Sequence, residues 1–158
     1  MILEAKNQFH TAMVVEDLDR SMQELTGLFG LRWSPCIDTE VPIWSPDGGV
    51  QPMRFEAVYS VESPHLELIA AVPGTMWGGG SRPIHHFGYW ADDLVAESAE
   101  LEKHGLSCVA GAMVDGVLFG FAYHATRDGL LVELVDRSVF PDWKGFLNGD
   151  IAFGQSAD

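Results

Sequence analysis

Two histidines and two glutamates occupy matching positions in a repeated sequence pattern. His10 opens the stretch HTAMVVEDL, and His86 opens HFGYWADDL, which reaches Asp-Leu at the same offset. Glu67 and Glu133 lie in the similar stretches HLELI and LVELV. Imidazole and carboxylate groups are ligands of Mn, Fe, Co, Ni and Zn. Two carboxylates about 4 Å apart repel by roughly 4 kcal/mol at an effective dielectric near 20, and a divalent cation removes that conflict. The four residues therefore predict one site for a divalent metal ion. The sequence does not determine which of these metals binds.

The segments between these residues predict the same elements in each half. After the first histidine, Leu18, Met22, Leu25 and Phe29 have the spacing of one helix face. Asp17 in the first half, and Asp92 or Asp93 in the second, are candidate helix N-caps. Stretches rich in aromatic and branched residues follow both helices and predict strands. Each half is therefore predicted to be a βαβββ module.

The boundaries follow from this repeat. Module 1 is expected over about residues 8–72, a flexible linker over 73–83, module 2 over about 84–136 and a C-terminal tail over 137–158. Residues 39–49, where the first module is longer, are predicted to form a loop. The chain's 158 residues fit one domain, residues 1–158.

Composition excludes several classes of function. The net charge is −14, which repels nucleic-acid backbones. No apolar run approaches the ~20 residues that cross a bilayer, and the first residues lack the pattern of a signal peptide. The two cysteines, Cys36 and Cys108, are far apart and are typical of thiols in a reducing compartment. We therefore expect a cytoplasmic protein that binds neither nucleic acid nor membranes.

The motifs around the four residues resemble those of the vicinal oxygen chelate superfamily, which includes glyoxalase I, methylmalonyl-CoA epimerase, extradiol dioxygenases and bleomycin-resistance proteins. The resemblance covers roughly residues 8–136. It implies an α+β fold of two tandem βαβββ modules that form an open half-barrel sheet, with helices on the outer face. It also implies a homodimer, and a metal (Zn, Ni, Co, Mn or Fe) bound by His10, Glu67, His86 and Glu133.

Within this superfamily, a glutamate at both carboxylate positions is most similar to glyoxalase I. This implies a metal-dependent isomerase, epimerase or lyase that acts on a small, largely apolar carbonyl compound through an enolate-type intermediate. Glu67 or Glu133 would be the base, and the sequence does not say which. The alternatives are an extradiol-type Fe(II) dioxygenase with His10, His86 and Glu133 as its triad, or a non-catalytic, resistance-type binding protein.

The strand pattern adds further candidates for the substrate pocket. Trp90 shares the parity of His86, and His65 shares that of Glu67. Tyr123 and His124 are neighbours, so only one of them faces the site. A three-residue loop, Arg127-Asp128-Gly129, would pair Tyr123 with Glu133, whereas a two-residue loop would pair His124 with it. The resemblance favours the longer loop, which predicts Tyr123 as a catalytic hydrogen-bond donor and Phe121 as a pocket residue.

Overall fold

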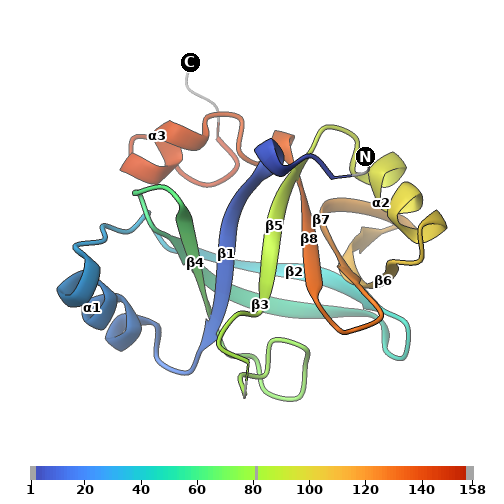
Figure 1. The fold of residues 1–158 in the computed structure, drawn as a ribbon, viewed down its shortest axis with the longest axis horizontal. Coiled ribbons are helices and arrows are strands. Elements are labelled where there is room, and N and C mark those ends of the chain that lie inside the picture. The colour runs from blue at the N-terminus through green and yellow to red at the C-terminus, as the bar shows by residue number, and fades with distance from the viewer. Residues whose placement is uncertain (1–2, 81, 156–158) are drawn as a thin grey trace. The chain divides into compact units, whose positions relative to one another are not determined.

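The structure is a computed structural model, and it describes residues 3–80 and 82–155. Residues 1–2, 81 and 156–158 lie outside the described residues. Residue 81 belongs to the predicted linker, and residues 156–158 belong to the predicted tail. The elements along the chain are η1 (Ala5–Asn7), β1 (Gln8–Val15), α1 (Leu18–Phe29), β2 (Ile37–Ser45), β3 (Gly49–Tyr59), β4 (His65–Ala70), β5 (His86–Ala91), α2 (Leu94–Lys103), β6 (Ser107–Val114), β7 (Val117–Ala125), β8 (Leu131–Asp136), η2 (Arg137–Val139) and α3 (Trp143–Asn148) (Figure 1).

Each predicted module has its expected order of one strand, one helix and three strands. The two helices begin as the sequence predicts, because Asp17 accepts a hydrogen bond from the Arg20 amide at 2.9 Å and Asp93 accepts one from the Ala96 amide at 3.0 Å. Helix α1 ends at Gly30, whose φ of 69° is left-handed and suits glycine. The α+β class is as predicted.

The expectation of an open half-barrel sheet is wrong. The hydrogen-bonded strand order is β1-β4-β3-β2-β6-β7-β8-β5, and it closes on itself as a barrel. An open sheet would leave two edge strands with a row of unpaired amide and carbonyl groups, and closure removes both edges. The predicted loop over residues 39–49 is also wrong, since most of it extends β2, where Ile43 pairs with Ala112 of β6. This longer strand supplies pairing that the sequence pattern did not reveal.

The chain divides into two compact units, one formed mainly by the second module with residues 40–54 of the first, and the other mainly by the rest of the first module and the tail. One unit comprises Met1–Phe9, Glu40–Arg54 and His86–Val139, and the other comprises His10–Thr39, Phe55–His85 and Phe140–Asp158. They are called unit 1 and unit 2 below and are described separately. No helix among the described residues is long and apolar enough to cross a membrane.

In unit 1, helix α2 packs against strands β6, β7 and β8 (Figure 1). Their shared core consists of Ala91, Leu94, Leu101, Cys108, Ala122 and Leu134. In unit 2, helix α1 contacts β4. Trp77 is only 1% exposed and packs edge-on against Phe55, with ring centroids 4.9 Å apart. Trp77 is thus buried, while the flexibility of the linker over residues 73–83 stays a prediction.

Candidate metal centre

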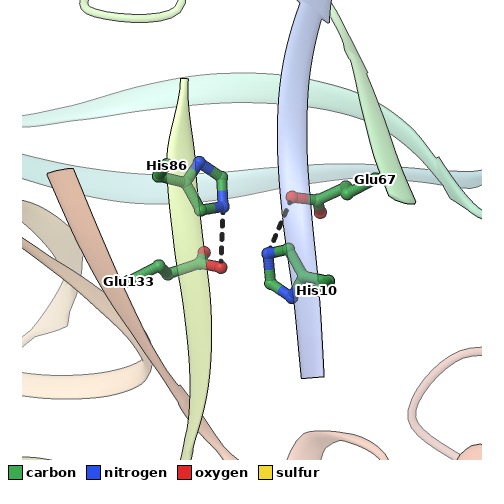
Figure 2. Close-up of side chains that lie close together, drawn as sticks. All are labelled: His10, Glu67, His86 and Glu133. Carbon is green, nitrogen blue, oxygen red and sulfur yellow. Dashed lines mark hydrogen bonds and ion pairs between the residues drawn. The ribbon is translucent and has the colours of Figure 1, made fainter. Parts of the chain in front are cut away.

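In unit 2, His10 and Glu67 form a buried pair on two parallel strands. The register of β1 and β4 pairs His10 with His65 and Ala12 with Glu67, so these side chains share one face of the sheet. His10 Nε2 lies 3.2 Å from Glu67 Oε2 (Figure 2). Both residues are buried, since His10 is 2% and Glu67 5% exposed.

Unit 1 contains an equivalent pair in the same register. Strands β5 and β8 are also parallel, and Gly88, two residues after His86, pairs with Glu133. Ala12, two residues after His10, pairs with Glu67 in the same way. His86 Nε2 lies 3.1 Å from Glu133 Oε2, and both residues are buried (Figure 2). The two modules thus repeat the atoms and the geometry of the pair, as well as the residue types.

The geometry of each pair fits two ligands of one metal ion. Ligand atoms about 2.1 Å from an ion lie roughly 3.0 Å apart at a right angle and roughly 3.4 Å apart at a tetrahedral angle. The observed separations of 3.2 Å and 3.1 Å lie between these values. A buried carboxylate also needs a positive partner, because removing a bare anion from water is costly. A protonated imidazole or a bound cation would provide this positive charge. The spacing and chemistry of each pair are therefore compatible with a metal ion.

A tyrosine lies beside each histidine–glutamate pair. Tyr59 of β3 pairs across the sheet with Glu67, and Tyr123 of β7 pairs with Glu133. The Tyr59 ring is edge-on to His10, with centroids 5.3 Å apart and an angle of 76° between ring planes, and the Tyr123 ring is edge-on to His86 at 4.9 Å and 88°. The sequence did not identify Tyr59, because it stands eight residues before Glu67 whereas Tyr123 stands ten before Glu133.

The register of β7 is the one that the longer loop predicts. Tyr123 pairs with Glu133, and His124 pairs with Val132. His124 lies on the opposite face, where its Nδ1–H donates to the Leu106 carbonyl at 2.9 Å and its Nε2 accepts from the Ser98 hydroxyl at 3.0 Å. Burial lowers the pKa of His124 by more than the hydrogen bond to the Leu106 carbonyl and the charge of Glu102 raise it. His124 is therefore a neutral structural histidine beneath α2.

The three predicted pocket residues lie in different surroundings. In unit 1, Trp90 shares the face of His86, stacks on Phe9 at 3.6 Å between centroids and has the Arg137 guanidinium 5.3 Å from its ring. Phe121 lies edge-on to Tyr123, with ring centroids 5.7 Å apart. In unit 2, His65 hydrogen-bonds to the Ser60 carbonyl and to the Trp143 indole. Contact of these residues with a substrate stays a prediction.

Thiols are poor candidates for additional ligands here. Burial raises the pKa of Cys108 to about 11, which disfavours the thiolate that a metal binds. Burial and the charge of Glu56 also raise the pKa of Cys36. The ligand chemistry that the described residues offer is thus imidazole and carboxylate.

Comparison with known proteins places these features in a family. A family model described as the Glyoxalase/Bleomycin resistance protein/Dioxygenase superfamily matches residues 9–123. A methylmalonyl-CoA epimerase from Mycobacterium tuberculosis is 17% identical with a TM-score of 0.57, over 82% of this chain and 87% of that chain. No curated protein matches.

Two further solved structures are similar to the same extent. A variant methylmalonyl-CoA epimerase of Streptomyces coelicolor, in complex with 2-nitronate-propionyl-CoA, is 16% identical with a TM-score of 0.58, over 82% of this chain and 93% of that chain. A hypothetical protein from Bacillus halodurans is 15% identical with a TM-score of 0.58, over 82% of this chain and 92% of that chain. At these identities the similarity is one of fold.

Proposed function

Since the chain belongs to the Glyoxalase/Bleomycin resistance protein/Dioxygenase superfamily, we propose that it is a metal-dependent isomerase, epimerase or lyase. Its substrate is a small, largely apolar carbonyl compound. The observation that carries the proposal is the repeated buried pair, in which an imidazole nitrogen and a carboxylate oxygen lie 3.2 Å apart in one unit and 3.1 Å apart in the other.

The two pairs together hold one divalent ion. His10, Glu67, His86 and Glu133 are the candidate ligands among the described residues, and all four are buried. Two neutral imidazoles and two carboxylates balance the charge of a divalent cation. Zn, Ni, Co, Mn and Fe all accept this ligand set. When bound, the ion would supply Lewis-acid polarisation of a carbonyl oxygen.

A glutamate carboxylate moves the proton. A hydrogen next to a carbonyl is acidic enough for a positioned carboxylate to remove it, which gives an enolate. Donation of a proton to the other face of the carbon by the second glutamate, or return of the proton by the same glutamate to a neighbouring atom, gives the epimerised or isomerised product. Glu67 and Glu133 are the buried carboxylates suited to this task, because an environment poor in water strengthens their electrostatic interactions with the reacting group.

Tyr123 assists at the substrate oxygen. Tyr123 pairs with Glu133 across the sheet, and its ring is edge-on to that of His86. Tyr123 therefore lies beside the His86–Glu133 pair. A phenol hydroxyl can donate a hydrogen bond to an oxygen on which negative charge develops. Trp90 and Phe121 provide apolar surface on the same sheet face for the rest of the substrate.

The similar epimerase structures direct the choice of substrates for a first screen. One of them binds 2-nitronate-propionyl-CoA, an analogue with a polyanionic tail. The present chain carries a net charge of −14, which disfavours a polyanion by long-range repulsion. Substrates without phosphate groups are therefore expected to be preferred over coenzyme A thioesters.

Proton exchange into solvent tests the proposal directly. The metal-loaded protein is incubated in D₂O with a panel of carbonyl compounds, and loss of the α-proton signal is followed by NMR. Exchange that needs the metal, and that Glu67→Gln or Glu133→Gln abolishes, supports the proposal. Oxygen consumption with catechols and no exchange would instead identify a dioxygenase. Ligand binding with neither reaction would identify a binding protein.

We also propose that the protein is a cytoplasmic homodimer. Both cysteines are free thiols, which favours a reducing compartment. Light scattering of the purified protein measures the assembly, and a mass of one chain would contradict the dimer.

A further inference from the structure

The C-terminal segment of unit 2 packs a group of aromatic rings around Tyr59. The ring centroids of Trp143, Phe140 and Phe146 lie 5.0, 5.9 and 6.5 Å from that of Tyr59, and all three rings meet it edge-on. Edge-to-face contact is a favoured geometry for aromatic side chains. The segment around α3 therefore fixes the Tyr59 ring, which is only 4% exposed.

The same segment also contacts strand β4 through one hydrogen bond. The indole Nε1–H of Trp143 donates to His65 Nε2 at 3.4 Å. His65 accepts at Nε2 because its Nδ1–H donates to the Ser60 carbonyl at 2.9 Å, which sets the ring's tautomer. Trp143 and His65 also meet edge-on, with centroids 5.4 Å apart.

Tyr59 and His65 are both neighbours of His10. The Tyr59 ring is edge-on to the His10 ring, and His65 is the residue with which His10 pairs across β1 and β4. We propose that Trp143 is a positioning residue for His10, acting through Tyr59 and His65. The C-terminal segment, which lies outside the repeat, thus becomes part of the support of the metal site. The role of His10 as a ligand rests on the proposed function.

A ligand imidazole needs such support. The terminal torsion of histidine is broad, so neighbouring groups must hold the ring in the orientation that ligates. Loss of groups that orient a ligand typically lowers metal affinity by about 10-fold to 100-fold. Trp143 contacts both neighbours of His10, so its removal should reduce affinity at the lower end of this range, since His10 itself remains.

Zinc affinity of two variants in the same aromatic group provides the test. Trp143→Ala is expected to weaken Zn²⁺ binding to the metal-free protein by about tenfold in competition with a chromophoric chelator. Phe153→Ala is the matched control, because Phe153 contacts Phe140 and Phe146 in the same group. It should change zinc affinity less than twofold. Equal losses in the two variants would overturn the proposal, because they would show only a general loosening of the C-terminal segment.

A double-variant cycle tests the path through Tyr59. If Trp143 acts mainly through this ring, Trp143→Ala should have much less effect in a Tyr59→Leu background than in the wild-type chain. Trp143→Phe keeps a ring beside Tyr59 but removes the bond to His65, so most of the affinity should return. Independent, additive effects of Trp143→Ala and Tyr59→Leu would contradict the proposed path.

A metal-free measurement separates this inference from the proposed function. Histidine side-chain NMR of the apo protein should show one His10 signal in wild type and in Phe153→Ala, but a broadened or shifted signal in Trp143→Ala. If this change occurs and wild type binds no zinc, the positioning role stands and the metal proposal fails. If His10 is unaffected in Trp143→Ala, the positioning role is refuted whether or not zinc binds.

Discussion

Substitution of His124 tests whether this residue is structural, as its position beneath α2 indicates. The side chain is fully buried, and it hydrogen-bonds to the Leu106 carbonyl and the Ser98 hydroxyl. His124→Leu leaves both groups buried without that partner, at a cost of about 1–3 kcal/mol each. The apolar side chain offsets part of this loss, so we expect the free energy of unfolding to fall by about 2–4 kcal/mol.

Urea denaturation of the metal-free protein, followed by circular dichroism, measures this change. Zinc affinity should be unaffected, because His124 points away from Glu133. The double variant His124→Leu/Ser98→Ala is the control, since removing both partners of a hydrogen bond costs less than removing one. It should recover part of the lost stability. A loss below about 0.5 kcal/mol, or a loss of zinc binding with stability intact, would refute our assignment of His124.

Three further predictions concern pH, Tyr123 and the metal. Burial lowers the pKa of His124 below its ordinary value of 6.5, so the unfolded chain binds a proton that the folded chain excludes. The free energy of unfolding should therefore fall as the pH falls below about 6.5. Urea titrations should show a weaker pH dependence in His124→Leu than in wild type, and an identical dependence would contradict this. Tyr123→Phe should lower the turnover number about tenfold without changing metal content, as measured by α-proton exchange and metal analysis; unchanged turnover would remove Tyr123 from the reaction. Chelation should abolish exchange while the melting temperature drops by only a few degrees, because we expect a core of this size to fold without the metal. Complete unfolding would show that the metal is structural.

Much of each module could be predicted because its signals are local. Asp17 and Asp93 mark helix starts through hydrogen bonds within one turn, and the repeat aligns His10 with His86 directly. The residues left two loop lengths open before Glu133, and the resemblance to the superfamily favoured the one that pairs Tyr123 with Glu133. Such features depend on a few neighbouring residues, so the sequence contains them.

Closure of the barrel could not be predicted because it depends on pairing between distant strands. The pattern around Pro42 and Gly48 suggested a loop, yet β2 runs through Ser45 and pairs with β6. Tyr59 was missed for a related reason. It stands eight residues before Glu67, whereas Tyr123 stands ten before Glu133, so equal spacing does not align them. Only the cross-strand register shows that both tyrosines pair with their glutamates.

The tail illustrates a third limit. The sequence placed a tail over residues 137–158 outside the repeat, and in the structure this tail contains α3, which begins at Trp143 after the cap of Asp142. Nothing in the sequence identified Tyr59 and His65 as the partners of Trp143. Those contacts join residues more than seventy positions apart, and their specificity comes from the folded surface.

The central claim is that the two buried pairs share one metal ion. Anomalous diffraction from crystals grown with zinc, with data collected on both sides of the zinc edge, tests it most directly. The account predicts one zinc peak per chain, about 2.0–2.2 Å from Nε2 of His10 and His86 and from a carboxylate oxygen of Glu67 and Glu133. Absence of a peak at these residues, or a peak bound by only one pair, would contradict it.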